Sequence, residues 1–556
     1  MLDVTENPPP RLLPEGYYLE NFERLLATVA ERYGDLLLAG ENAFLSDFAR
    51  ISLPARRLYV RLLSRRGPLV RRDRLSYREI PDLPAAGAEL EKAGFADAGA
   101  ELPAAEHLSL LLREELIQLA GELGRPLPRS VKRPDAQAAL ELAEDIRLLP
   151  VLLARWPSLR PLRLEVVQLF RLLFFGNLFQ DLKEFVLNDI GIVEFESYDL
   201  SRELRLFESR HAIDSDLQLR LLRGAVGQHL WQGEFEPALE IAKAVVAAWD
   251  VWHERSRRQA ESLLISVAQA AEKLGQPELA LGLYQKASRP PARERKARLL
   301  AGAGHYQQAL QLCREIEAEP RDETEASFAP FFREKLEKQL DPARKRPRRP
   351  PLATLELAVD RDVVSVEQQA LAALAGLGRR GVYAENWLWK SLFGLAFWDI
   401  VYAPVPGAFH HPFQYGPHDL DSPGFRQARA EAIDKRLAEL EAAADLRPGL
   451  LATFEKKLGK ANALVSWHPS SRTSLELALE LIRGPHLAKV ADRLSRDLGR
   501  YRRGLPDLLV ECQNAPGFEL WEVKGPGDQL RPEQKSWLSY LNANGLPAGV
   551  LKLRWR

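Results

Sequence analysis

The segment GLPDLLVECQNAPGFELWEVKG, residues 504–525, decides the fold of the C-terminal part of the chain. Residues 508–511 and 518–524 have the composition of two β-strands, and Asn514, Pro516 and Gly517 favour a turn between them. Because side chains alternate along a strand, Glu522 and Lys524 should point to one face, and the Val523 side chain should enter an apolar layer on the other. Asp507 opens the first strand. The segment therefore predicts a hairpin that brings two carboxylates and a lysine together at one end.

This cluster predicts metal-dependent chemistry. Burying Asp507 and Glu522 side by side would be costly without a cation. A hard divalent ion prefers carboxylate and carbonyl oxygens, and Mg²⁺ keeps several waters for substrate and nucleophile. Lys524 could then hold an attacking water or stabilise charge that grows on a phosphate. The alternative interpretation of the bare pattern is a surface hairpin with a salt bridge.

The chain upstream of the hairpin is predicted to be mostly helical. A basic, proline-rich stretch at 341–352 marks a linker and separates residues 353–556, which contain the hairpin, as a domain of their own. Within 161–340, Gly233, Gly275 and Gly304 are each followed five residues later by Ala-Leu. Helices flank each glycine, and this pattern is typical of tetratricopeptide-like helical pairs. The spacing is irregular, so we expect a structural scaffold rather than a peptide-binding groove.

Two further helical regions precede the repeats. Residues 17–80 are predicted to be helical and belong to an N-terminal region at 1–95. Residues 96–160 contain a helix at 110–123, a break at 124–128 and a second helix that runs from Val131 to near Leu148. This helix–loop–helix resembles a SAP module, a small helical pair that binds the DNA backbone. Any short helical hairpin would give a similar pattern.

Charge is balanced overall, with 77 basic and 77 acidic residues, so nucleic-acid binding would need a local basic surface. Nine arginines lie between Arg56 and Arg78, opposed by Asp73. They indicate either phosphate contacts or a solvated helix face. The candidate DNA-binding residues from the whole chain are Arg61, Arg65, Arg66, Arg71, Arg72, Lys132, Arg502 and Arg503.

Other features exclude several classes of protein. The two cysteines, Cys313 and Cys512, are too few for a cysteine-based zinc site or a disulfide framework. The first 30 residues do not have the order of a signal peptide, and no apolar run is long enough to span a membrane. A reducing, cytoplasmic compartment is therefore expected. His410, His411 and His418 lie among prolines and leave zinc binding open as a minor alternative.

The pattern Pro-Asp507…Glu522-x-Lys524 resembles that of the PD-(D/E)xK nuclease superfamily. The surroundings RRGLPDL at 502–508 and EVKGPGD at 522–528, followed by Gln534 and Trp537, resemble its VRR-NUC branch. Two further segments also resemble this family, at 385–400 (ENWLWKSLFGLAFWDI) and 58–66 (LYVRLLSRR). The resemblance extends roughly from Tyr17 to the end. It is to the Fanconi-associated nuclease family, in which a SAP-like module, helical repeats and a VRR-NUC domain follow one another, and it implies an α/β fold for residues 353–556.

This resemblance implies roles for individual residues. Asp507 and Glu522 match metal-binding carboxylates, Val523 matches a position whose backbone carbonyl binds metal, and Lys524 matches the catalytic lysine. Glu385 matches an acid on a helix that completes the metal cage. Gln534, at the start of the following helix, is expected to orient a ligand or the scissile phosphate. The implied cofactor is Mg²⁺ or Mn²⁺, as a pair of ions.

The resemblance also implies a function. Family members cut branched DNA near 5′ flaps and degrade DNA from 5′ to 3′ in the repair of interstrand crosslinks. Animal members begin with a ubiquitin-binding zinc finger, for which this chain has neither cysteines nor length, so a bacterial member in the cytoplasm, at the nucleoid, is expected; a eukaryotic member would be nuclear. The long helical N-terminal part favours a monomer that provides its own DNA contacts. The alternatives are an endonuclease that resolves four-way junctions and a non-catalytic DNA-binding scaffold.

Overall fold

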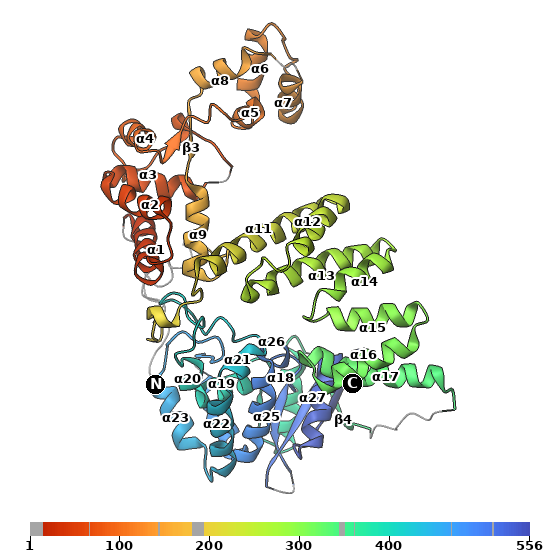
Figure 1. Cartoon of the computed structure of the whole chain (residues 1–556). Helices are drawn as coiled ribbons and strands as arrows, with labels where there is room; N and C mark the ends of the chain where they lie inside the picture. Colours follow the sequence, from red (N-terminus) through yellow and green to blue (C-terminus); the bar gives the residue numbers. More distant parts are fainter. Residues whose placement is uncertain are drawn as a thin grey trace. The chain divides into compact units, whose positions relative to one another are not determined.

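The computed structural model describes residues 15–65, 67–142, 145–180, 194–343, 351–360, 362–468, 470–513 and 516–556. The chain divides into two compact units, Met1–Ile192 and Val193–Arg556. Figure 1 shows the first unit as helices α1 to α9 with a small sheet, and the second as a run of helical pairs followed by an α/β region. None of the described helices is long and apolar enough to cross a membrane.

The first unit begins with four helices around an aromatic core. Phe22, Phe44, Phe48, Tyr59 and Phe95 are buried, and their rings contact one another. Side-chain oxygens of the preceding Ser or Asp cap the amino ends of α3 and α4. The helices are α1 (Tyr17–Tyr33), α2 (Ala39–Arg50), α3 (Leu53–Leu63) and α4 (Leu83–Lys92).

A three-stranded antiparallel sheet follows, which the sequence did not predict. Its order is β1-β3-β2, and its strands are β1 (Val70–Arg71), β2 (Ala96–Asp97) and β3 (Ser158–Pro161). The expectation that residues 17–80 are helical is therefore wrong beyond Leu63, where β1 follows. A short 3-10 helix, η1 (Arg72–Arg74), follows β1.

The region predicted to be SAP-like consists of helices between β2 and β3. They are α5 (Ala104–Leu108), α6 (Arg113–Glu122), α7 (Arg133–Glu141) and α8 (Leu148–Arg155), and their apolar residues share one core. A single helix from Val131 to Leu148 is not observed: α7 ends at Glu141, and the Asp145 carboxylate accepts a hydrogen bond from the Arg147 amide, which stabilises a turn. Helix α9 (Leu164–Phe175) follows β3. Assignment of these helices to a SAP module stays a prediction.

Helical pairs open the second unit. Gly233, Gly275 and Gly304 have φ of 80°, 71° and 83°, so each occupies the left-handed region between two helices, where glycine has no steric penalty. Ala238, Ala280 and Ala309 are fully buried, which lets the paired helices pack closely. The helices are α11 (Arg210–Gln232), α12 (Phe235–Ala247), α13 (Arg257–Lys273), α14 (Pro277–Gln285), α15 (Ala292–Gly302), α16 (Tyr306–Ala318) and α17 (Glu323–Leu340), with short 3-10 helices η3 (Arg202–Leu204) and η4 (Glu254–Ser256).

The α/β region is built on a five-stranded sheet of order β4-β8-β7-β6-β5. β8 is parallel to β4 and β7, whereas β6 is antiparallel to β5 and β7. The predicted hairpin is confirmed, with Leu508 opposite Trp521. The strands are β4 (Ala353–Val359), β5 (Gly381–Tyr383), β6 (Leu508–Glu511), β7 (Phe518–Lys524) and β8 (Ala548–Trp555).

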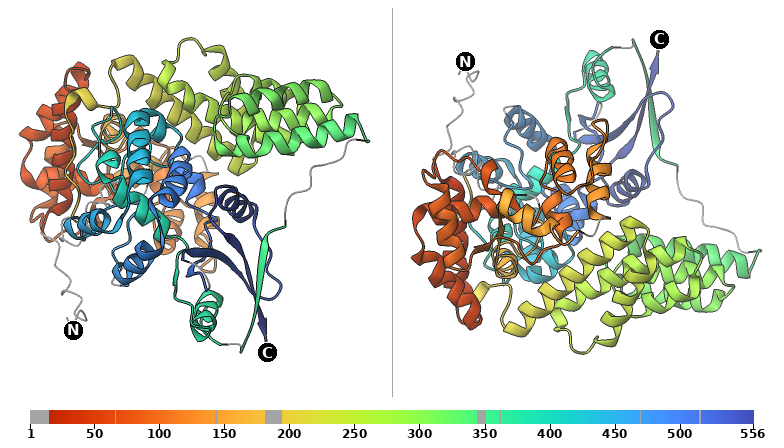
Figure 2. Two further views of the ribbon diagram at one scale, coloured as in Figure 1. Left: turned by 90° about the horizontal axis from the view of Figure 1, so that it is seen from below. Right: turned by 90° about the horizontal axis from the view of Figure 1, so that it is seen from above.

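Helices cover both faces of this sheet (Figure 2). On one face, α18 (Val366–Gly376) packs on Val523 and Leu551, as the alternation along β7 predicts. On the other, α27 (Pro532–Ala543) packs on Leu520 and Val550 within the largest apolar cluster. The remaining helices are α19 (Leu388–Ala396), α20 (Trp398–Val401), α21 (Gly424–Ala428), α22 (Ala430–Ala442), α23 (Arg447–Lys456), α24 (Ser471–Leu481), α25 (Gly484–Arg496) and α26 (Leu498–Tyr501).

Candidate active site

Asp507 lies immediately before β6, and local contacts fix its carboxylate beside β7. The Val523 amide donates a hydrogen bond to Asp507 Oδ2 at 2.7 Å. Three residues earlier, Gly504 has φ of 79°, and a Cβ there would lie 2.8 Å from the backbone carbon of Glu533. Only glycine therefore lets this segment pass so close to the start of α27. The result is an Asp507 side chain that is 4% exposed, at the end of the hairpin.

Glu522 is the most deeply buried acid of the cluster, with 1% exposure. Its Oε1 accepts hydrogen bonds from Lys524 Nζ at 2.8 Å and from Gln534 Nε2. Its Oε2 is buried and has no hydrogen-bond partner among the described residues. Leaving a buried carboxylate oxygen without a donor is unfavourable, so Glu522 would be stabilised by a proton shared with the Asp507 carboxyl or by a bound cation.

The two carboxylates influence each other strongly. Burial, followed by the charge of Glu522, raises the pKa of Asp507 to about 8. Burial also raises the pKa of Glu522, although the neighbouring Lys524 acts in the opposite direction. Both shifts show that two negative charges at this place are unfavourable without a cation. The pair fits a divalent ion, because binding one would favour the ionised form of both groups.

Glu385 lies near the pair, but not in the predicted position on a helix. It follows β5 in a turn, and α19 begins only at Leu388. The reason is local: Asn386 has φ of 62°, in the left-handed region, which an α-helix does not allow. The Ala384 and Glu385 amides donate to the Asp507 carbonyl at 2.7 and 3.3 Å, which holds this turn next to Asp507.

The Glu385 carboxylate is oriented toward a tyrosine in this structure. Its Oε2 accepts a hydrogen bond from the Tyr383 hydroxyl at 2.7 Å. Its charge nevertheless contributes to the raised pKa of both Asp507 and Glu522. In the parts of the chain that the structure describes, no three His, Cys, Asp or Glu side chains enclose an ion-sized space. The metal-binding roles predicted for Glu385 and for the Val523 carbonyl stay predictions.

The predicted DNA-binding arginines are largely held by contacts within the first unit. Arg61 pairs with Glu79 at 2.5 Å, and Arg72 pairs with Glu91. Arg65 is more exposed and donates to the Tyr77 hydroxyl at 2.8 Å. Arg66 lies outside the described residues.

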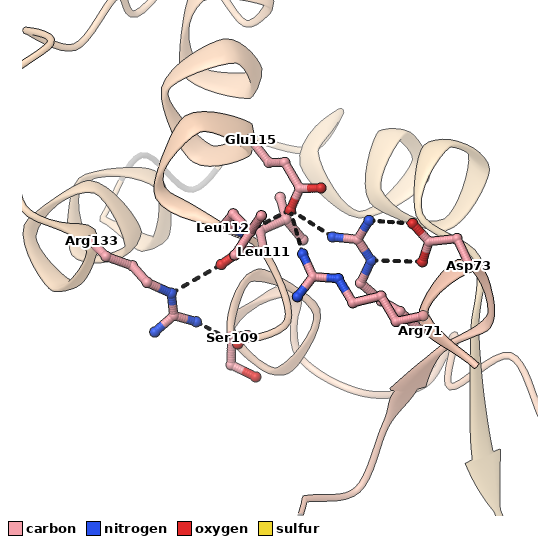
Figure 3. Close-up of polar contacts among 8 residues, drawn as sticks. Arg71, Asp73, Ser109, Leu111, Leu112, Glu115 and Arg133 are labelled. Atoms are coloured by element: carbon pink, nitrogen blue, oxygen red, sulfur yellow. Dashed lines mark hydrogen bonds and ion pairs between the residues drawn. The ribbon is translucent and has the colours of Figure 1, made fainter. Parts of the chain in front are cut away.

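Arg71 has the most complete set of partners. Figure 3 shows it between Asp73 and Glu115, to which it donates at 2.5 and 2.6 Å, while Arg133 donates to the carbonyls of Ser109 and Leu111. With 4% exposure, Arg71 connects β1 to the first turn of α6. Its contacts explain its position without DNA, and a DNA contact by Arg71 stays a prediction.

The other three candidates differ in their surroundings. Arg502 pairs with Asp421 at 3.0 Å. Arg503, just before Gly504, and Lys132, just before α7, are exposed. DNA binding by these three residues likewise stays a prediction.

A second group of arginines is not evident from the sequence. Arg220 and Arg223 lie on α11, Arg258 on α13, and Arg289 after α14. Desolvation and the charges of neighbouring arginines lower the pKa of Arg223 and Arg258. The i, i+3 spacing of Arg220 and Arg223 was the available signal, but the packing of α11, α13 and the residues after α14 brings the group together.

The histidines do not form a metal site in the described structure. His410 and His411 are buried, and the His410 and His418 rings lie 5.0 Å apart. Burial and the charges of Arg220 and Arg258 lower the pKa of His418. His418 therefore belongs to the surroundings of the arginine group, and the zinc alternative gains no support.

Comparison with known proteins places this site in a family. Residues 16–97 match the family model "FAN1, HTH domain", and residues 442–555 match the VRR-NUC domain. The VRR-NUC match includes Asp507, Glu522 and Lys524, and nucleases of this type are typically metal-dependent. The five-stranded sheet extends beyond the match, since β4 and β5 precede residue 442.

Relatives match over nearly the whole chain. A Fanconi-associated nuclease 1 homolog from Pseudomonas aeruginosa is 35% identical, over 98% of this chain and 97% of the relative. Human Fanconi-associated nuclease 1 is 27% identical over 98% of this chain, which spans 63% of the human protein. A rice homolog is 26% identical, and the chain spans 62% of it.

Solved structures agree with these matches. A crystal structure of paFAN1 bound to 5′-flap DNA with a 2-nucleotide flap and a gap has a TM-score of 0.83 and 32% identity, over 98% of this chain and 99% of that one. A second, with a 1-nucleotide flap, has a TM-score of 0.78 and 34% identity, over 97% of this chain and 99% of that one. With the carboxylate pair, the lysine and the surrounding sheet all in place, the chain belongs to the Fanconi-associated nuclease family, a family of DNA nucleases.

Proposed function

We propose that this chain is a divalent-metal-dependent phosphodiesterase that cuts branched DNA close to a 5′ flap and degrades DNA from 5′ to 3′. The observation that carries the proposal is the buried Glu522 carboxylate, which lies beside a second buried acid, Asp507, and whose Oε2 has no hydrogen-bond partner among the described residues. A surface hairpin with a salt bridge would not bury two acids together. A centre that binds a cation would.

Asp507 and Glu522 would hold the metal, together with the Val523 carbonyl and the Glu385 carboxylate. Bound Mg²⁺ or Mn²⁺, as one ion or a pair, would supply an activated water and stabilise charge on the phosphate oxygens. Gln534 contributes indirectly, because its side-chain amide donates to Glu522 Oε1 and fixes the orientation of that carboxylate. Its own Oε1 accepts from the Arg531 amide at 2.9 Å, so Gln534 is itself held in place.

Lys524 is placed for a direct role in the reaction. It lies on the same strand face as Glu522, with Nζ 2.8 Å from Glu522 Oε1. A cation at this position would stabilise negative charge on the phosphate in the transition state, or hold the attacking water. Its ion pair with Glu522 keeps it oriented before substrate binds.

Selection of branched DNA would come from shape. Contacts to phosphates position a protein on DNA without reading sequence. The arginine group around Arg258 is suited to such contacts, because the Arg258 guanidinium makes no hydrogen bond or ion pair to the described residues and lies among like charges. The paFAN1 structures hold 5′-flap DNA with a gap, and this supports the same substrate class here. Action as a monomer in the cytoplasm, in interstrand crosslink repair, is part of the proposal.

A panel of end-labelled synthetic DNAs tests this function. It contains a 5′ flap, a 3′ flap, a four-way junction and plain duplex, each incubated with Mg²⁺, Mn²⁺ or EDTA. The expected result is metal-dependent cutting near the 5′-flap junction. Preference for the four-way junction would indicate a resolvase instead, and binding without cutting in either metal would indicate a scaffold.

A further inference from the structure

Lys552 shares a face of the sheet with the candidate catalytic residues. In the parallel pairing of β7 and β8, Glu522 is opposite Val550 and Lys524 is opposite Lys552. Residues opposite each other on paired strands project to the same face. Burial agrees, because Leu551 and Leu553 belong to the apolar cluster on the other face, whereas Lys552 is exposed. The two lysines therefore stand side by side on neighbouring strands.

Lys552 differs from its neighbours in having no partner. Lys524 pairs with Glu522 at 2.8 Å, and Arg554 pairs with Glu356 at 2.7 Å. Lys552 makes no ion pair or side-chain hydrogen bond to any residue that the structure describes. Like charges directly opposite each other on paired strands are unfavourable. On its other side, Lys552 is opposite Glu356 of β4, whose carboxylate pairs with Arg554 rather than with Lys552. An anion beside the two lysines would reduce the repulsion between them.

A pocket of about 520 Å³ lies at this place. Its lining includes Lys524, Lys552, Trp555 and the turn 525–528. Two carboxylates also line it, and both are engaged: Glu356 by Arg554, and Asp528 by the Gly525 amide, which donates to Asp528 Oδ2 at 3.0 Å. The one cationic side chain of the lining without a described partner is thus Lys552, next to the site where a phosphate would react.

We propose that Lys552 binds the phosphodiester next to the scissile one, on the same DNA strand, and so positions the substrate. This rests on the proposed nuclease function. Asp507 lies just before β6, Glu522 and Lys524 lie on β7, and Lys552 lies on β8. These three strands are neighbours in the sheet, and adjacent strands are about 4.8 Å apart. A DNA strand that crosses this row presents its scissile phosphate to the carboxylates and its next phosphate to Lys552. Lys552 is a positioning residue, not a catalytic one.

The test combines a protein variant with a change in a single phosphate. Full-length wild type, Lys552→Ala and Lys552→Arg are compared on 5′-flap DNAs in which one phosphate next to the cut is replaced by an uncharged methylphosphonate. Lys552→Ala should lower kcat/KM about tenfold, mainly through KM, because one charged contact is lost. The methylphosphonate at the contacted position should cause a similar loss in wild type and little further loss in Lys552→Ala. Lys552→Arg should retain most of the activity.

Arg554→Gln is the matched control, on the same face of the same strand, because Glu356 already holds that guanidinium. This variant should keep the full methylphosphonate response. Binding in EDTA gives a readout that does not need cutting: Lys552→Ala should reduce the slope of log K against log salt by about 0.9. An unchanged salt slope would overturn the proposal. So would full additivity, at every substituted phosphate, of the losses in kcat/KM caused by Lys552→Ala and by the methylphosphonate. Absence of cutting by wild type would reject the nuclease function, while the salt slope would still decide the phosphate contact.

Discussion

The carboxylate centre, formed by Asp507 and Glu522, and the arginine-rich segment 56–78 both contain many charged groups. They differ in whether those groups are paired within the protein. In the segment, Arg61, Arg71 and Arg72 pair with carboxylates of the same unit. In the centre, Asp507 and Glu522 are buried together, and Glu522 Oε2 has no described partner. The segment has the larger number of charges in the sequence, but acids of the same unit neutralise several of them, whereas the two buried acids of the centre have Lys524 as their one described cationic partner.

This difference shows which kind of charge indicates function. A run of arginines is free to pair with acids that are distant in sequence, as Arg71 does with Glu115, 44 residues away. Such pairing stabilises the fold and leaves less charge for a ligand. Two acids buried side by side cannot each form an ion pair of this kind. Burial therefore disfavours their ionised forms, and the pKa values of both are raised.

The largest effect is expected from Lys524→Ala. Removing one group that stabilises charge in a transition state typically lowers kcat by about 100- to 1,000-fold. Lys524→Ala should therefore lower single-turnover cleavage of a 5′ flap by this amount. DNA affinity, measured by fluorescence anisotropy in EDTA, should change little. A comparable loss of affinity with normal kcat would mean that Lys524 only binds DNA.

The carboxylate pair should also make stability depend on pH. Because the pKa of folded Asp507 is raised to about 8, the folded state holds a proton that the unfolded state has already lost. Metal-free protein should therefore lose stability as pH rises from the ordinary pKa of an aspartate through about 8. Asp507→Asn should remove part of this loss, which a thermal midpoint series in EDTA would detect. Added Mn²⁺ should stabilise wild type more at high pH and the variant little at any pH. Parallel pH profiles would contradict the raised pKa.

Arg71→Ala tests the other side of the comparison. This side chain is 4% exposed and bonded to Asp73 and Glu115, so its removal should destabilise the first unit by about 2 kcal/mol. Urea unfolding of the full chain should show an earlier first transition. If stability is unchanged and DNA binding weakens instead, Arg71 contacts DNA rather than holding α6.

Arg65→Ala should have the smallest effect and the opposite character. Arg65 is exposed, and its described partner is the Tyr77 hydroxyl rather than an acid. Stability should change by less than about 0.5 kcal/mol. If Arg65 contacts a phosphate, the slope of log K against log salt should fall by about 0.9. An unchanged slope would remove Arg65 from the DNA interface.

Features that depend on neighbouring residues were predictable from the sequence. The hairpin of β6 and β7 follows from alternation and turn residues within 22 positions, so the shared face of Glu522 and Lys524 was predicted. The glycines between helical pairs were also recognised, because each acts within one turn.

Features that depend on residues distant in the sequence could not be predicted from it. The strands β1 and β2 have two residues each, too short to show a period, and both pair with β3 more than 60 positions later. Glu385 lies near Asp507 because β5 pairs with β6. Asn386 has a left-handed backbone conformation that keeps Glu385 outside α19, and the helical spacing of apolar residues does not predict that conformation. The partners of Arg71 and the isolation of Lys552 likewise depend on the assembled sheet and helices.

The most direct test of the central claim is single-turnover cleavage of one end-labelled 5′-flap DNA by wild type and Asp507→Asn, at saturating protein with Mg²⁺ or Mn²⁺. The substitution keeps the size of the side chain and removes its charge. Wild type should cut near the flap junction, and Asp507→Asn should show no detectable cutting although the DNA stays bound. Cutting by Asp507→Asn at a rate near that of wild type would contradict the assignment of the Asp507–Glu522 pair as the metal-dependent centre.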